Sequence, residues 1–163
     1  MQKELKIRFS DKNDIPFILE FVKSLARHAH HLDEVVATEA LLTENLFHHR
    51  YAEAIIAEID LKPIGYALFF HTFSTFLGKP GIYLEDLFVE EEFRSRGYGK
   101  QILSFLAKVA IERGCGRLEW SVLDWDKRAI KFYRSMEASP KDETTVFRLA
   151  GSKLAALALN KGV

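Results

Sequence analysis

The chain has 163 residues, of which 48% are apolar and 28% charged, which is typical of one globular domain. Its 23 basic and 23 acidic side chains cancel, so bulk charge indicates neither a nucleic acid nor an anionic membrane as partner. Cys115 is the only cysteine, which excludes a disulfide framework and favours a reducing compartment. No apolar run approaches the roughly 20 residues of a spanning helix. We therefore expect a single cytoplasmic domain, spanning 1–163, that binds a small molecule.

The first part of the chain predicts a strand followed by two helices. Residues 4–9 alternate polar and apolar side chains, as in a strand, and the polar cluster at 10–14 can cap a helix. An apolar stripe at helical spacing runs from Ile15 to Ala26. A shorter helix opens near Thr38, and both Thr38 and Asp33 are candidate cap residues.

The centre of the chain predicts a meander of three strands. Two apolar and aromatic runs, residues 52–59 and 63–73, are separated by a short polar connection at 60–62. This pattern is typical of an antiparallel hairpin. A third run at 81–89 follows a turn rich in glycine and proline, so it is expected to pair with the second.

The remaining part predicts alternating helices and strands. Apolar side chains recur at helical spacing over residues 97–113, and Gly114 and Gly116 are expected to end this helix. The other predicted elements are a strand at 116–123, a helix at 126–136, a final strand at 144–150 and an apolar tail at 154–159. The tail suits either a core element or a dimer contact.

The most informative segment joins the strand that ends at 87–89 to the helix that begins near residue 97. It consists of Arg94, Ser95, Arg96, Gly97, Tyr98, Gly99 and Lys100. Unpaired N–H groups and the dipole at a helix N-terminus attract an anion, and the two glycines let a diphosphate approach the main chain. No G-K-[ST] follows and a third glycine is missing, which excludes a P-loop and a dinucleotide fingerprint. The alternative is an ordinary loop between two elements.

Three ionisable side chains are candidates for proton transfer. Tyr133 shares a helix face with Ala129 and Ile130, which from periodicity alone also suits a core tyrosine. Glu85 and Asp86 are adjacent on the predicted strand 81–89, where alternation would send them to opposite faces. An alkyl ammonium, with a pKa of about 10.4, must lose a proton before it is nucleophilic, and a carboxylate can bind it and accept that proton. Pairing with a neighbouring Arg or Lys is the alternative role of either carboxylate.

The segment from Arg94 to Gly99 resembles the R/Q-x-x-G-x-G/A pyrophosphate-binding segment of the GNAT acetyltransferases, and the predicted order of elements is similar to that family throughout the chain. The resemblance implies an α/β GNAT fold, a mixed sheet flanked by helices in the order β-α-α-β-β-β-α-β-α-β. It also implies acetyl-coenzyme A as cosubstrate, no metal, and a Tyr133 that protonates the departing thiolate. In addition to the residues of the loop, the cofactor-binding residues it implies are Leu87, Phe88, Val89, Asp126 and Tyr133.

Within that family, the stretch from Thr72 to Asp86 resembles the T-Y-x-x-W-x-G-K-x-x-Y-L-E-D segment of the diamine, or spermidine/spermine, acetyltransferases. This resemblance implies a cytoplasmic homodimer that acetylates a polyamine or related small amine. It places Glu85 as the base, and Glu85, Asp86, Phe76 and His28 at the substrate. The sequence departs from the pattern at Ser74, where the family has an acidic residue, and at Phe76, where it has tryptophan.

We therefore expect an N-acetyltransferase in which a primary amine attacks the acetyl thioester directly in a ternary complex. The alternatives are an acetyltransferase acting on an amino acid, on thialysine or on a protein N-terminus, and a non-catalytic module that binds coenzyme A. A metal site is not expected, because the spacing of His28, His30 and His31 does not place three imidazoles on one side.

Overall fold

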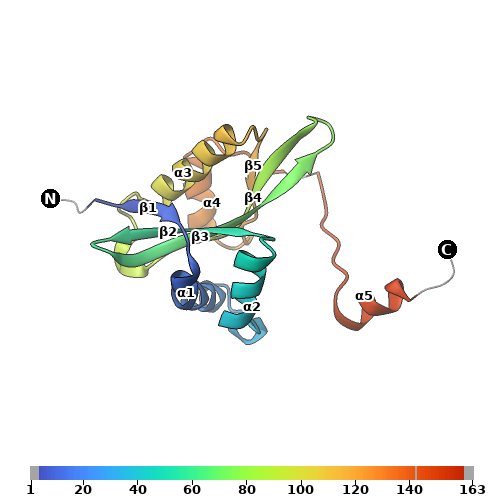
Figure 1. Ribbon diagram of the computed structural model, residues 1–163. Helices are drawn as coiled ribbons and strands as arrows, with labels where there is room; N and C mark the ends of the chain where they lie inside the picture. The colour runs from blue at the N-terminus through green and yellow to red at the C-terminus, as the bar shows by residue number, and fades with distance from the viewer. Residues whose placement is uncertain (1–3, 142, 160–163) are drawn as a thin grey trace. The chain divides into compact units, whose positions relative to one another are not determined.

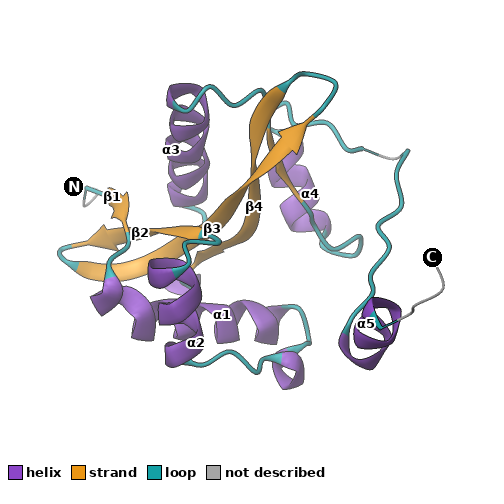
Figure 2. Ribbon diagram, turned by 45° about the vertical axis from the view of Figure 1, so that its right-hand side comes forward, coloured by secondary structure: helices purple, strands orange, loops and turns teal. Residues whose placement is uncertain are grey.

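The computed structural model describes residues 4–141 and 143–159, and its contacts form two compact units that divide after Leu123. The first unit is a sheet with helices on both faces (Figures 1 and 2). Its strands are β1 (Lys6–Phe9), β2 (Glu53–Ile59), β3 (Lys62–Ser74), β4 (Lys79–Val89) and β5 (Leu118–Trp120). Its helices are η1 (Lys12–Asp14), α1 (Ile15–His28), η2 (Leu32–Glu34), α2 (Glu39–Thr43), η3 (Glu44–His48), η4 (Glu91–Phe93) and α3 (Tyr98–Glu112). The second unit contains α4 (Lys127–Arg134) and α5 (Gly151–Ala158).

The sheet has the strand order β1-β2-β3-β4-β5. Its first four strands are antiparallel, whereas β5 pairs with β4 in parallel, so the predicted mixed sheet is confirmed. The predicted hairpin turns through Asp60 and Leu61, both with positive φ, as a two-residue turn of this kind requires. In Figure 2, α1 and α2 lie on one face of the sheet and α3 on the other.

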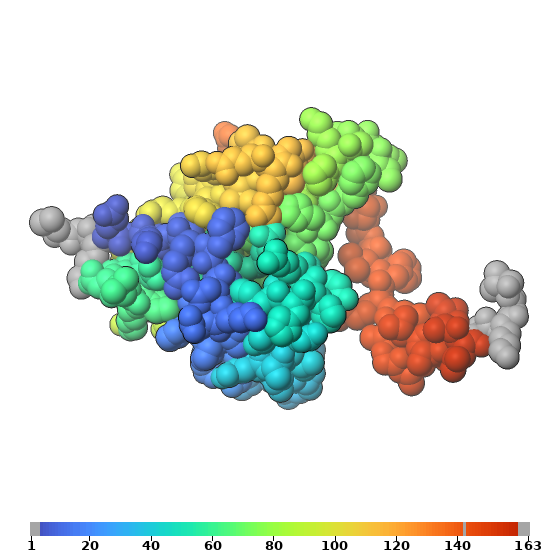
Figure 3. Space-filling model, in the orientation of Figure 1, coloured from blue at the N-terminus to red at the C-terminus, as the bar shows by residue number. Residues whose placement is uncertain are grey.

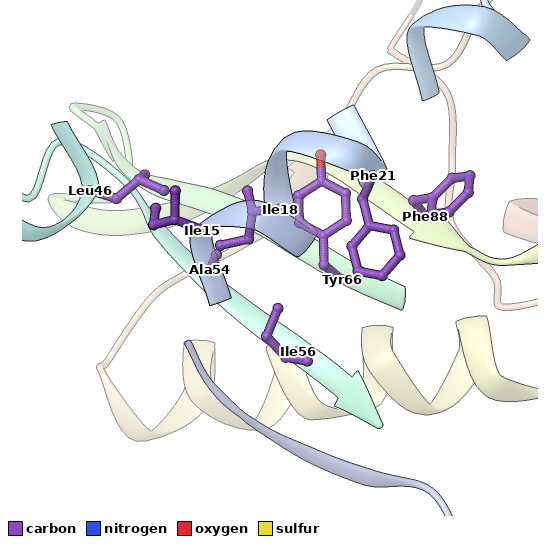
Figure 4. Close-up of a cluster of buried hydrophobic side chains, with 8 residues drawn as sticks. All are labelled: Ile15, Ile18, Phe21, Leu46, Ala54, Ile56, Tyr66 and Phe88. Carbon is purple, nitrogen blue, oxygen red and sulfur yellow. The ribbon is translucent and has the colours of Figure 1, made fainter. Parts of the chain in front are cut away.

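The apolar stripe of α1 forms the core on its face of the sheet, as predicted. Ile15, Ile18 and Phe21 of α1 are buried against Ile56, Tyr66 and Phe88 of the sheet (Figure 4). Figure 4 shows the Tyr66 ring beside that of Phe21, and the two rings are stacked with centroids 5.5 Å apart. This face of β3 and β4 is therefore held firmly against α1.

Several sequence predictions were wrong or only partly right. Residues 144–150 do not form a strand; Val146 and Phe147 are 90% and 93% exposed, and no described strand pairs with the segment. The pattern predicts a strand, but a strand forms only where it finds a neighbour to pair with. β5 has only three residues, because it pairs with β4 over only that length. Asp33 lies inside η2 and does not cap a helix, whereas Thr38 does cap α2, accepting a hydrogen bond from Leu41 N–H.

The apolar tail is helical in α5, and its leucines are exposed. Leu154 and Leu157 are 53% and 60% exposed, so the tail is not a core element of the described structure. The expectation of a single domain stays a prediction. None of the helices within the described residues is long and apolar enough to cross a membrane.

Candidate active site

A β-bulge interrupts β4 at Glu85. Leu84 pairs with Phe69 and Asp86 with Leu68, so two neighbouring residues of β3 face residues of β4 that are separated by one extra residue. That extra residue is Glu85. A bulge of this kind re-aims side chains and is common beside active sites. The regular alternation on which the prediction for Glu85 and Asp86 depended is therefore interrupted at Glu85.

Both carboxylates act on the hydroxyl of Tyr66, a residue that the sequence predicts only as part of an apolar strand. Tyr66 Oη donates a hydrogen bond of 2.5 Å to Asp86 Oδ2. Burial, the charge of Asp86 and, more weakly, the charge of Glu85 raise the pKa of Tyr66 well above its usual value. Burial raises the pKa of Asp86, and the hydrogen bond from Tyr66 opposes that rise. Glu85 is exposed and Asp86 half-buried, so the bulge presents two carboxyl groups with different surroundings.

Beyond the bulge, no described strand pairs with β4 on the side of β5. The two strands pair only where Ile82–Leu84 lies beside Leu118–Trp120. On its other side, β4 remains paired with β3 as far as Val89. Within the described residues, the outer backbone of 86–89 is therefore left without a partner strand. Such an edge can hydrogen-bond to an extended ligand in the way a further strand would.

The loop after β4 is held in shape by its own arginines. Arg94 Nε donates to the Val89 carbonyl oxygen at 2.8 Å, and its guanidinium lies 5.4 Å from the centre of the Phe88 ring. Arg96 donates to the Glu92 carbonyl oxygen at 2.9 Å. Both side chains thus brace the loop as well as adding positive charge beside it. Lys100 is exposed on the first turn of α3 and forms no ion pair with the described residues.

The start of α3 has the geometry of an anion site. Ser95 and Gly97 have positive φ, 62° and 82°, so the chain curls back before the helix begins. The first helical hydrogen bond runs from Gln101 N–H to the Gly97 carbonyl oxygen, which leaves the N–H groups of residues 98–100 without a helical acceptor. A Cβ placed on Gly97 would meet no atom within 4 Å, so open space lies beside the backbone there. Tyr98 is buried against Ile59 and Ile64, so only its backbone reaches this space.

Tyr133 lies on α4, in the second unit, together with Asp126. The face shared by Ala129, Ile130 and Tyr133 is half-buried while the basic residues around it are exposed, as the periodicity predicts. Burial, and then the charge of Asp126, raise the pKa of Tyr133 above its usual value, so the phenol keeps its proton at neutral pH. Asp126 Oδ1 accepts a hydrogen bond of 2.9 Å from Ala129 N–H and so caps α4. Its predicted contact with a cofactor remains a prediction.

Phe76, another predicted substrate residue, lies away from the bulge. Phe76 is fully exposed at the tip of the β3–β4 hairpin, which protrudes as the green knob in Figure 3. The tip begins five residue pairs from Leu84, roughly 17 Å along the strands. Ser74 is buried and its hydroxyl accepts a hydrogen bond from Leu77 N–H, so it shapes the tip. His28 is the exposed last residue of α1.

The bulge and the role of Tyr66 are the features that sequence reasoning missed. A bulge has no dependable residue signature, and the strand pattern of 81–89 continues through it. The available signal was chemical: a tyrosine in an otherwise apolar run needs a partner for its hydroxyl when it is buried. No group of three or more His, Cys, Asp or Glu side chains within the described ranges is arranged to hold a metal ion.

The chain is similar to known acetyltransferases. The profile of the Acetyltransferase (GNAT) family matches residues 19–137. An L-ornithine N5-acetyltransferase of Arabidopsis thaliana is 30% identical over 93% of this chain and 87% of its own length. A thialysine N-epsilon-acetyltransferase of Bos taurus is 33% identical over 93% of this chain and 96% of its own. The solved structure of an integron cassette protein from the mobile metagenome of V. cholerae is 29% identical, with a TM-score of 0.80 over 95% of this chain and 98% of that one.

Proposed function

The chain belongs to the GNAT family of acetyltransferases and has its fold, and on this basis we propose that it transfers an acetyl group from acetyl-coenzyme A to a primary amine at the end of a short aliphatic arm. The observation that carries the proposal is the bulge at Glu85, which places two carboxyl groups beside the unpaired edge of β4. The substrate ammonium and the extended cosubstrate would therefore bind to the same strand, β4.

The residues present fit acetyl-coenzyme A. The N–H groups at the start of α3 and the open space beside Gly97 suit a pyrophosphate, and Lys100 adds positive charge. The outer backbone of 87–89 suits the amide-bearing pantetheine arm, although the Val89 carbonyl is already occupied by Arg94. When bound, acetyl-coenzyme A supplies an acetyl group activated as a thioester. The chain itself has to bind the amine, remove its proton and protonate the leaving thiolate.

The role that we propose for each residue follows from its surroundings. Exposed Glu85 is placed to bind the ammonium and to accept its proton, directly or through one water. Asp86 lies beside it as the second negative group. We assign Tyr133 as the proton donor to the thiolate, the role that the resemblance to the GNAT acetyltransferases implies; a phenol is protonated at neutral pH, and burial raises its pKa further. An N–H group of the unpaired β4 edge can stabilise the developing oxyanion. No acyl-enzyme is required.

Among amines, we propose the side-chain amine of a basic amino acid as the first choice and a polyamine as the second. The two relatives described above act on ornithine and on thialysine, whose side chains are short arms ending in an amine. Where the diamine enzymes have an acidic residue, this chain has Ser74, and that side chain is buried in the hairpin tip. A tip without that charge attracts a polycation less strongly.

We also propose a cytoplasmic homodimer. Exposed apolar side chains support it, because patches of this kind mark protein contacts. Phe73 and Leu77 are 64% and 54% exposed beside Phe76 at the hairpin tip, and Val146 and Phe147 are exposed in the second unit. A partner subunit is the proposed surrounding for Phe76, which lies far from Glu85 in its own chain. Light scattering that gives the mass of one chain would contradict the dimer.

Release of coenzyme A thiol tests the proposed function. The purified protein is offered acetyl-coenzyme A with ornithine, lysine, thialysine, putrescine or spermidine in separate reactions. Turnover with an amino acid supports the first choice, and turnover with only putrescine or spermidine supports the second. Binding of acetyl-coenzyme A without thiol release in any reaction would contradict the proposal and favour a protein acceptor or a binding module.

Gly97 allows a test of the pyrophosphate site alone. Gly97→Ala should raise the KM for acetyl-coenzyme A about tenfold, equivalent to roughly 1.4 kcal/mol, because the new Cβ fills the space proposed for phosphate. Gly114→Ala is the matched control, since Gly114 lies just beyond the opposite end of α3 with φ of 69° and the same open space. Both variants carry the left-handed penalty of roughly 1–2 kcal/mol in stability. Equal KM values in the two variants would contradict the site.

A further inference from the structure

The hydroxyl of Tyr66 lies at a fixed position in the core. The residue is 0% exposed, and its ring is stacked on Phe21 of α1 at an interplanar angle of 19°. Phe88, its cross-strand partner on β4, also contacts Phe21 and closes the same cluster (Figure 4). A ring packed in this way cannot change rotamer without opening the core. Its Oη is therefore a fixed hydrogen-bond donor.

The donor is directed at Asp86 by the register of the two strands. Tyr66 pairs with Phe88 and Leu68 with Asp86, so the bond crosses the ladder diagonally on the face covered by α1. One oxygen of Asp86 is held by Tyr66, and no other hydrogen bond to this carboxyl group is found within the described residues. The other oxygen is thus available beside exposed Glu85, the residue that the bulge inserts.

A half-buried carboxyl group next to another acid tends to take up a proton. Burial already raises the pKa of Asp86, and the hydrogen bond from Tyr66 is what opposes this. The polar groups facing this position are Tyr66 on β3 and Glu85 on β4, whereas α1 contributes apolar side chains such as Ile18 and Phe21. The phenol cannot take over the charge itself, because its own pKa is raised well above the usual value.

We infer that Tyr66 is a positioning residue of the amine site: its hydroxyl holds the Asp86 carboxylate ionised beside Glu85, so that the two carboxylates bind the substrate ammonium together. This inference rests on the proposed function. If Tyr66 were only a core tyrosine with a satisfied hydroxyl, its removal would lower stability without changing how the amine binds.

Tyr66→Phe tests the inference, because it removes one oxygen atom and keeps the packed ring. The acid limb of kcat/KM for the amine should move up by about one pH unit, since Asp86 loses the donor that favours its charged form. At a pH on this acid limb, the KM for the amine should rise several-fold in the variant, while the KM for acetyl-coenzyme A stays unchanged. Tyr83→Phe is the matched control, because Tyr83 on β4 also loses a hydrogen-bonded hydroxyl, in its case the one paired with Ser121. In the control, kcat/KM for the amine should fall at the same acidic pH as in the wild type.

A second measurement does not depend on turnover. Carboxyl carbon chemical shifts, followed by NMR through a pH titration of the folded protein, report the pKa of Asp86 in the wild type and in Tyr66→Phe. Asp86 should titrate at higher pH in the variant, and Asp86→Asn identifies its signal. An unchanged titration in a folded Tyr66→Phe protein would overturn the inference even if turnover is normal. Failure of the wild type to acetylate any amine, with the Asp86 shift observed, would instead contradict the proposed function and leave the Tyr66–Asp86 coupling established.

Discussion

Replacing Tyr133 with phenylalanine is expected to lower kcat about 10²- to 10³-fold, the usual contribution of a positioned general acid. A phenol is protonated at neutral pH, and burial and the charge of Asp126 raise the pKa of Tyr133 further. A proton donor of this kind acts on the leaving thiolate, so the KM values for both substrates should change little. Steady-state kinetics with saturating acetyl-coenzyme A measure the effect.

The pH dependence of kcat tests the same assignment of Tyr133 as a proton donor. A group that must be protonated supports activity below its pKa, and the activity is lost as pH rises through that pKa. Because the pKa of Tyr133 is raised above its usual value, the alkaline limb of kcat should lie above the pH range in which an exposed tyrosine titrates. Tyr51→Phe, which changes a tyrosine that is 71% exposed, is the matched control and should keep full activity. A Tyr133→Phe protein with wild-type kcat would show that the thiolate takes its proton from solvent.

Replacing Glu85 with glutamine should reduce kcat/KM for the amine about 10²- to 10³-fold at neutral pH, because the base that deprotonates the ammonium is removed. The loss should shrink as pH rises. An amine with a pKa of about 10.4 is mostly charged at neutral pH, so the variant depends on the small fraction that arrives already neutral. That fraction grows about tenfold per pH unit, and log kcat/KM for the variant should rise with a slope near one.

The control for this experiment is Glu112→Gln, which neutralises an exposed glutamate near the end of α3. It changes the net charge of the chain by the same amount and should leave the profile unchanged. A Glu85→Gln protein whose deficit is the same at all pH values would show that Glu85 binds the amine without accepting its proton. In that case Asp86 becomes the candidate base.

Local patterns in the sequence predicted most elements of the fold correctly. The stripe from Ile15 to Ala26 identified α1 because helical burial is a local property, readable from spacing alone. The segment from Arg94 to Lys100 predicted the loop before α3 for the same reason, because a positive φ such as that of Gly97 is a local property of the backbone. Both features depend on residues within one or two turns of each other.

The features that were missed depend on residues far apart in the chain. The bulge at Glu85 exists only in the register of β4 against β3, and neither strand reveals that register alone. Tyr66 and Asp86 are 20 positions apart, so their hydrogen bond has no local signature. The strand predicted at 144–150 does not form, although its composition suits a strand, because no described strand pairs with it.

The register of β3 and β4 also shows that the proposed site interrupts the sheet. Leu68 and Phe69 are consecutive, and they pair with Asp86 and Leu84. A chain without Glu85 would therefore close these two strands into an uninterrupted ladder, and every other side chain would stay on its present face. β4 carries one residue more than its sheet needs, and that residue is the exposed carboxylate proposed to do the chemistry. The interruption of the ladder is thus what adds this carboxylate to the strand.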